Sequence, residues 1–216
     1  MKKFDFNTIN NFDNHILQSI PNYDLLFNSI VRLSEYFITD NYKIYDIGCS
    51  TGKLLYKLQE QFSNIEMIGI DNSKNLLPDN CQTNLKFICA DLNKKFVLEP
   101  ASLIFSIFTL QFLHKETRQL LINNIYNSLC KGGAFIFSEK VYSKNSMTQD
   151  MFTFTYYDYK KTSFTEEEIL TKEQDLRKIL RPYSTEENIE MLHKAGFKTI
   201  ELFYKYFNFE GYLCIK

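Results

Sequence analysis

The sequence predicts an α/β fold: a mostly parallel, seven-stranded sheet with helices on both faces and an antiparallel hairpin at its C-terminal end. Short apolar or β-rich segments alternate with helical patterns between residues 43 and 138, and strands at that spacing form parallel units. A glycine-rich turn at 46–52 joins the first strand to a helix. Residues 199–216 alternate well enough for two strands joined near 208–211.

The N-terminal half contains one helical region followed by three predicted strands. Apolar residues recur at intervals of three and four from Phe4 to about Asp40, with a break at Pro21-Asn22, which predicts helices. The pattern then becomes short and β-rich. The expected elements are strands at 43–47, 65–70 and 85–89 and a helix at 53–62.

The C-terminal half continues the alternation and then becomes helical. The segment 102–108 is nearly all apolar, as expected of a strand buried on both faces. Glycine is expected just beyond helix ends, so Gly132-Gly133 should stop one helix and Gly196 another. The expected elements are strands at 102–108 and 134–138 and helices at 118–129, 143–179 and 185–194.

Length and composition indicate one domain, 1–216, with a helical cap at 1–40 and a helical insertion or lid at 143–182. Twenty-five basic residues against 26 acidic ones give a net charge of −1, which argues against a stable nucleic-acid or membrane partner. The five cysteines and three histidines show no metal-ligand spacing, so no metal is expected. The N-terminus lacks the apolar core of a signal peptide, which favours the cytoplasm.

The turn Asp46-Ile-Gly-Cys-Ser-Thr-Gly52 has the wrong spacing for a phosphate-binding P-loop or for the dinucleotide fingerprint. Its pattern, Asp-x-Gly-x-x-x-Gly, resembles motif I of the class I S-adenosylmethionine (SAM) dependent methyltransferases, which have a Rossmann-like fold. SAM carries no phosphate, so the turn need admit only a ribose and an amino-acid tail. Asp46 can then lie near the ammonium of that tail, Asp71 can hold the ribose hydroxyls, and Asp91-Leu92 can contact the adenine.

Longer stretches resemble the carboxy-SAM synthase family. They are Ser19-Ile-Pro-Asn-Tyr23, Tyr45-Asp-Ile-Gly-Cys-Ser50, Ile70-Asp-Asn-Ser73, Phe108-Thr-Leu-Gln-Phe-Leu113, Arg118-Gln-Leu-Leu121, Gly132-Gly-Ala134, Ser138-Glu-Lys140, Leu192-His-Lys-Ala-Gly-Phe197 and Asn208-Phe209. The resemblance implies a homodimer in which SAM takes a carboxylate from prephenate, a small-molecule substrate. The product, carboxy-SAM, serves a second enzyme that modifies the tRNA wobble uridine. The implied cofactor-binding residues are Tyr23, Gly48, Cys49, Ser50, Gly52, Asp71, Asn72, Asp91 and Leu92, in addition to Asp46.

Two positions depart from that family. Its members have an arginine two residues before the histidine of the Leu-His-Lys-Ala-Gly-Phe segment, which binds the carboxylate of the modified cofactor, whereas this chain has Met191. They also have an asparagine where this chain has Ile107. Methionine cannot replace a bidentate guanidinium, so the pocket either uses another cation, such as Arg181, or no longer handles a carboxylate.

Four positions are candidates for binding the substrate: Gln111, Glu139, Arg181 and Met191. For Glu139, a role as base or anchor and a role as partner of Lys140 or Arg118 are equally favoured, and His193 is interpreted as a packed helix residue. The aromatic group at 152–159 is interpreted as a packed lid or interface in preference to a pocket lining.

Three functional hypotheses remain open. The first is a methyltransferase acting on an unidentified acceptor, because a sulfonium is already activated and needs mainly in-line positioning. The second is carboxy-SAM synthase itself, and the third is a scaffold protein that binds SAM without turnover. The sequence identifies no general base.

Overall fold

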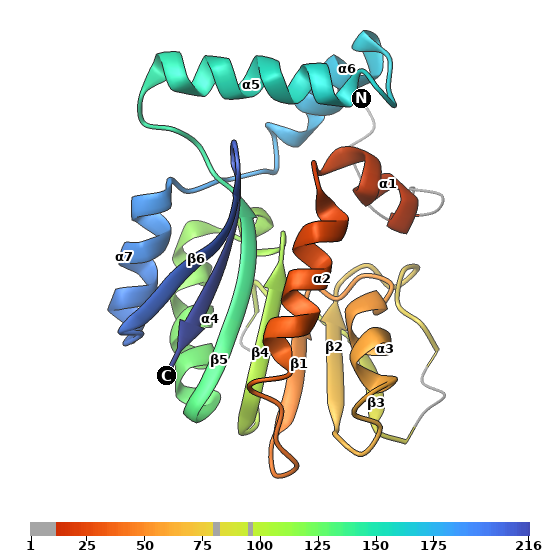
Figure 1. The fold of residues 1–216 in the computed structure, drawn as a ribbon, viewed down its shortest axis with the longest axis vertical. Helices are drawn as coiled ribbons and strands as arrows, with labels where there is room; N and C mark the ends of the chain where they lie inside the picture. Colours follow the sequence, from red (N-terminus) through yellow and green to blue (C-terminus); the bar gives the residue numbers. More distant parts are fainter. Residues whose placement is uncertain (1–11, 80–82, 95–96) are drawn as a thin grey trace.

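The structure is a computed structural model that describes residues 12–79, 83–94 and 97–216 (Figure 1). The strands are β1 (Lys43–Ile47), β2 (Met67–Asp71), β3 (Leu85–Cys89), β4 (Ala101–Ile107), β5 (Leu129–Lys140), β6 (Thr199–Tyr206) and β7 (Phe209–Ile215). The helices are α1 (Phe12–Ser19), α2 (Tyr23–Ser34), α3 (Lys53–Gln59), the 3₁₀ turn η2 (Leu110–Phe112), α4 (Lys115–Ser128), α5 (Ser146–Lys160), α6 (Glu166–Leu176) and α7 (Thr185–Ala195).

The strands of the described residues form one sheet in the order β3-β2-β1-β4-β5-β7-β6. The pairs from β3 to β5 are parallel, while β7 pairs antiparallel with both β5 and β6. The expected architecture is therefore confirmed. The part of the predicted N-terminal helical region that precedes residue 12 lies outside the described residues.

Three predictions about element boundaries were wrong, the first being the single helix expected at 143–179, which is two helices, α5 and α6. Helix α4 is not stopped by Gly132-Gly133, because the chain already becomes extended at Leu129, and both glycines lie inside β5. A Cβ at Gly133 would lie 2.8 Å from the Ser102 carbonyl oxygen, so glycine at this position allows a close approach of β4. The hairpin turn lies at 207–208, ahead of the predicted turn, since β7 already begins at Phe209. Gly196 closes α7 as expected, with φ +116°.

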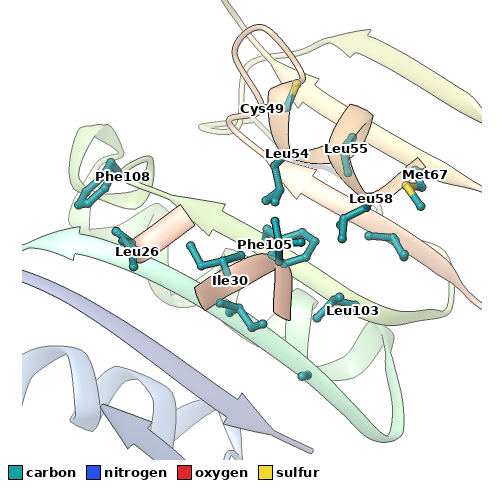
Figure 2. Close-up of a cluster of buried hydrophobic side chains, with 14 of the residues drawn as sticks. Leu26, Ile30, Cys49, Leu54, Leu55, Leu58, Met67, Leu103, Phe105 and Phe108 are labelled. Atoms are coloured by element: carbon teal, nitrogen blue, oxygen red, sulfur yellow. The ribbon is translucent and has the colours of Figure 1, made fainter. Parts of the chain in front are cut away.

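Each face of the sheet buries its own hydrophobic cluster, because successive strand residues point to opposite faces. Helices α2 and α3 pack on one face, where Leu26, Leu55 and Phe105 are fully buried (Figure 2). Helices α4 and α7 cover the other face with Ile122 and Leu192. No helix of the described residues is long and apolar enough to cross a membrane.

Helices α5 and α6 lie away from both layers, beyond the ends at which β1 and β4 finish, and α1 lies beside them (Figure 1). The predicted insertion at 143–182 therefore covers the carboxyl edge of the parallel strands. In open α/β sheets that edge is where ligands bind.

Candidate functional site

A cavity of about 410 Å³ lies at the carboxyl edge of the parallel strands. This volume is within the usual range for sites that bind small molecules. One end is lined by the glycine-rich turn and by the residues that follow β2 and β3. The opposite end is lined by residues of α1, β5, α5 and α6. The two ends differ in charge, and each is described in turn.

The glycine-rich turn brings backbone directly to the cavity. Gly48 and Gly52 have φ of +82° and +73°, a region that disfavours residues with a Cβ. A Cβ at Gly48 would lie 2.0 Å from Thr109 Oγ1, so no larger residue fits there without displacing the loop after β4. The turn is fixed by Gly48 N–H, which donates to the carbonyl of Ile70 at 2.6 Å.

Asp71 joins this turn to the end of β2. Its Oδ2 accepts from the Ser50 backbone N–H at 2.9 Å, and its Oδ1 accepts from the Ser73 N–H at 2.8 Å. Each carboxylate oxygen can accept more than one hydrogen bond, so both retain capacity toward the cavity that Asp71 lines. Asn72, Asp91 and Leu92 line the same end, as the sequence predicted.

Four predicted cofactor residues do not line the cavity. Asp46 lies beneath the turn, and burial together with the nearby Asp71 raises its pKa to about 7. Tyr23 lies close enough to Asp46 for that carboxylate to raise the pKa of its phenol, although burial contributes more. The Cys49 side chain packs into the core of the α2–α3 face, and Gly52 begins α3.

The opposite end of the cavity is rich in lysine. Lys140 and Lys172 line it, and Lys140 Nζ lies 3.6 Å from Glu173 Oε1 and 4.7 Å from the centre of the Tyr156 ring. Lys160 is 1% exposed and lies 5.4 Å from the centre of the same ring. Burial lowers the pKa of all three amines, and that of Lys172 falls to about 7. Three cations thus surround one carboxylate.

The substrate candidates separate into one that lines the cavity and three that do not. Gln111 lines it, with Oε1 accepting from Lys140 N–H at 2.9 Å and Nε2 donating to the Phe108 carbonyl at 3.2 Å. Arg181 points elsewhere, donating to the Ile179 carbonyl at 2.9 Å. The expectation for Met191 was wrong, because it is buried in the core beneath α4 and α7.

Glu139 is 2% exposed and behaves as a structural carboxylate. Burial raises its pKa to about 8, while Arg118 and the N–H groups of residues 109–111 oppose the rise. Arg118 acts on Glu139 only through its charge: no ion pair joins the two among the described residues, and Glu139 Oε1 and Arg118 Nε are buried without a hydrogen-bond partner. Lys140 pairs instead with Glu173. His193 is exposed, and its Nδ1 donates to the Phe197 carbonyl at 3.0 Å.

Sequence reasoning missed His15, Lys140, Lys172 and Tyr156 as cavity residues. In the Ser-Glu-Lys segment, Glu139 was the predicted substrate residue. Successive strand residues point to opposite faces, and it is the next residue, Lys140, that lines the cavity. His15 and Lys172 carry no local pattern, since they meet only through the tertiary fold. Among residues 12–79, 83–94 and 97–216, no His, Cys, Asp or Glu side chains gather as a metal site.

The end of the cavity lined by the glycine-rich turn, Asp71 and Asp91 fits SAM. Its glycine turn admits close approach, Asp71 keeps acceptor capacity for hydroxyls, and no basic side chain lines that end as a phosphate would require. Buried Asp46 Oδ1 and Ser50 Oγ have no hydrogen-bond partner within the described residues. Ser50 and Asp71, which line the cavity, are therefore the residues that would hold the amino-acid tail and ribose, with Asp46 buried behind them.

Comparison with known proteins defines the class. Residues 44–133 match the methyltransferase domain family. Among solved structures, human N-acetylserotonin methyltransferase in complex with SAM is 16% identical, with a TM-score of 0.58 over 95% of this chain and 55% of that one. A chain from the solved complex between the Haloferax volcanii Trm112 methyltransferase activator and a putative methyltransferase is 13% identical, with a TM-score of 0.58 over 89% of this chain and 94% of that one. The fold is that of a class I, SAM-dependent methyltransferase.

Full-length relatives define the family. A carboxy-S-adenosyl-L-methionine synthase from Staphylococcus epidermidis is 37% identical, covering 97% of this chain and 94% of that protein. The protein of the same name from Methylococcus capsulatus is 36% identical, covering 95% and 89%. The one from Nautilia profundicola is 34% identical, covering 99% and 94%. The chain belongs to the carboxy-S-adenosyl-L-methionine synthase family and is a SAM-dependent transferase.

Proposed function

We propose that this enzyme synthesises carboxy-SAM from SAM and a small carboxylate donor, prephenate. The methyl carbon of SAM would lose a proton and gain the carboxylate, while prephenate would lose its ring carboxylate and hydroxide to become phenylpyruvate, so that proton and hydroxide leave as water. The observation that carries the proposal is that Lys140 and Lys172 line the same cavity as Asp71 and Asp91. The family relationship supports the same reaction. Of the three hypotheses, this one uses both ends of the cavity.

The lysine end suits a carboxylate because several buried amines lie close together there. Three amines face the single carboxylate of Glu173, and their mutual repulsion and burial hold their pKa values down. An entering anion stabilises the charged amines. In a partly buried site, such a contact is stronger than in water.

The chain's own residues would position the reactants and exclude water. When bound, SAM supplies a methyl group activated by its sulfonium. Phe108, Tyr156 and Phe209 also line the cavity, and their apolar rings exclude solvent from it. Holding donor and acceptor in line can supply much of the rate enhancement in a group transfer.

Met191 does not line the cavity, because its side chain is buried in the core with Ile122 and Leu192, so the comparison of candidates turns on the residues that do line it. Ile107 does line the cavity, where the family has an asparagine. That apolar substitution favours the second candidate, methyl transfer to an unidentified acceptor. The two candidates differ in whether the donor's carboxylate is transferred.

Incubation of the purified protein with SAM and prephenate, followed by mass spectrometry of the nucleotide, tests the proposal. Carboxy-SAM, heavier than SAM by one CO₂, is the expected product. Lys140→Met and Lys172→Met should each reduce its formation, whereas Lys205→Met, at a lysine that pairs with Glu210 away from the cavity, should not. SAM binding without carboxy-SAM formation would refute the proposal and favour methyl transfer or a scaffold.

The family relationship supports three further proposals: a homodimer, a cytoplasmic location, and a contribution to tRNA wobble-uridine modification. Light scattering should give twice the mass of one 25.6 kDa chain. Deleting the gene in its host should remove the oxyacetylated uridine from tRNA. A monomeric mass or unchanged tRNA would contradict the respective proposal.

A further inference from the structure

Helix α1 forms a wall of the cavity without being part of the hydrophobic core. Phe12, His15, Ile16 and Ser19 line the cavity, yet no residue of α1 is fully buried. Ile16 packs against the core of the α2–α3 face, but the other apolar residues of α1 do not belong to that core cluster. The position of the helix also depends on specific contacts with other segments.

These contacts reach both ends of the cavity. Thr51 Oγ1, in the glycine-rich turn, donates to Asp13 Oδ1 at 2.9 Å. On the other side, the hydroxyl of Tyr156 in α5 donates to the Ser19 carbonyl at 2.8 Å, and that of Tyr159 donates to the Leu17 carbonyl at 3.1 Å. Helix α1 thus connects the cofactor turn with the helices that cover the lysine end.

His15 contacts the Lys172 amine directly. Nζ of Lys172 contacts His15 Nε2 and donates to Ser19 Oγ at 3.4 Å. Burial, with the charges of Lys172 and Lys160, lowers the pKa of His15 to about 4, so its ring is neutral at neutral pH. A neutral ring protonated on Nδ1 accepts at Nε2, which is the atom that faces the amine.

Within the described part of the chain, groups from four elements influence or contact Lys172. Lys160 of α5 and Lys140 of β5 repel its ammonium, Glu173 of α6 attracts it, and His15 of α1 accepts from it. Burial is the largest influence on its pKa, and α1 contacts the amine through His15 and Ser19. Helix α1, more than 150 positions away in sequence, therefore restricts the orientation of the Lys172 amine.

We propose that His15 is a positioning residue that holds Lys172 toward the cavity, so that α1 completes the site for the donor's carboxylate. The inference rests on the proposed function for the identity of the donor. Its geometric part, that His15 fixes the Lys172 amine, can be measured without turnover.

The experiment compares His15→Ala, His15→Gln and the control Asn14→Ala, an exposed position on the same helix. The KM for prephenate should rise about tenfold or more in His15→Ala, the effect of losing a well-placed hydrogen bond to a charged group. The Kd for SAM should stay within about twofold. His15→Gln, whose amide oxygen can accept from the amine, should recover most of the loss, and Asn14→Ala should resemble wild type.

Amine labelling with acetic anhydride across pH, read by mass spectrometry on the Lys172 peptide, gives the second measurement. Wild type should label half-maximally near pH 7. His15→Ala should shift this point upward by about one unit or more, because water then reaches the amine. Unchanged labelling and KM in His15→Ala, or equal losses in Asn14→Ala, would overturn the inference. Wild type that labels near pH 7 but forms no carboxy-SAM would refute the proposed function alone.

Discussion

Replacing Asp71 by alanine is expected to weaken SAM binding about a hundredfold while the chain stays folded. The side chain lines the cavity at the end of β2, and each carboxylate oxygen accepts one backbone N–H, from Ser50 and from Ser73. The remaining acceptor capacity of both oxygens faces the position proposed for the ribose. Alanine therefore removes two contacts to the ligand and loosens the turn that supports it.

The magnitude follows from those two contacts. A hydrogen bond to a charged group contributes about 1.5–3 kcal/mol. Because Asp71 is only partly buried, the lower figure applies, and two such bonds give about 3 kcal/mol. Each 1.4 kcal/mol is tenfold in affinity, so the expected loss is about a hundredfold. Water in the cavity can bond the released N–H groups, which limits the loss of folding stability.

Isothermal titration calorimetry with SAM and with its demethylated product measures this loss. Asp71→Asn keeps one acceptor oxygen and should give an intermediate affinity. Asp40→Ala, an exposed aspartate ahead of β1 at the other end of the strand, is the matched control and should bind as wild type does. If Asp71→Ala bound SAM within about twofold of wild type, Asp71 would not hold the cofactor.

Three further outcomes are expected. Gly48→Ala should destabilise the protein by about 2–4 kcal/mol in urea unfolding, because its Cβ meets Thr109 at positive φ, and adding Thr109→Ala should restore only the steric part. Asp46 has a raised folded pKa, so wild-type stability should fall as pH rises from about 4 to 7, by up to about 4 kcal/mol, whereas Asp46→Asn should show a flatter profile. The KM for prephenate should increase as pH rises through about 7, because Lys172 then loses its proton. A KM that stays constant from about pH 6 to about pH 8, the range over which Lys172 titrates, would contradict this role.

The sequence determined the sheet and the cofactor end of the cavity. Alternating β-rich and helical periods predicted the strands, and the turn at 46–52 predicted where the first strand meets a helix. Asp71 and Asp91 could be placed at the same edge because parallel strands end together there. Each of these features is recognised from residues that are neighbours in the sequence, because local periodicity identifies strands, helices and the turns between them.

Only the tertiary structure decided the lysine end. His15, Lys140, Lys160 and Lys172 come from four separate elements, and no spacing in the chain relates them. The same limit explains Met191, whose helix packs on the far face of the sheet although its neighbours in sequence match the family. Strand and helix periods report which face of an element is apolar, but they do not report which distant elements meet there. Packing beyond the sheet edge brings the lysines together, and that packing depends on contacts between residues far apart in sequence.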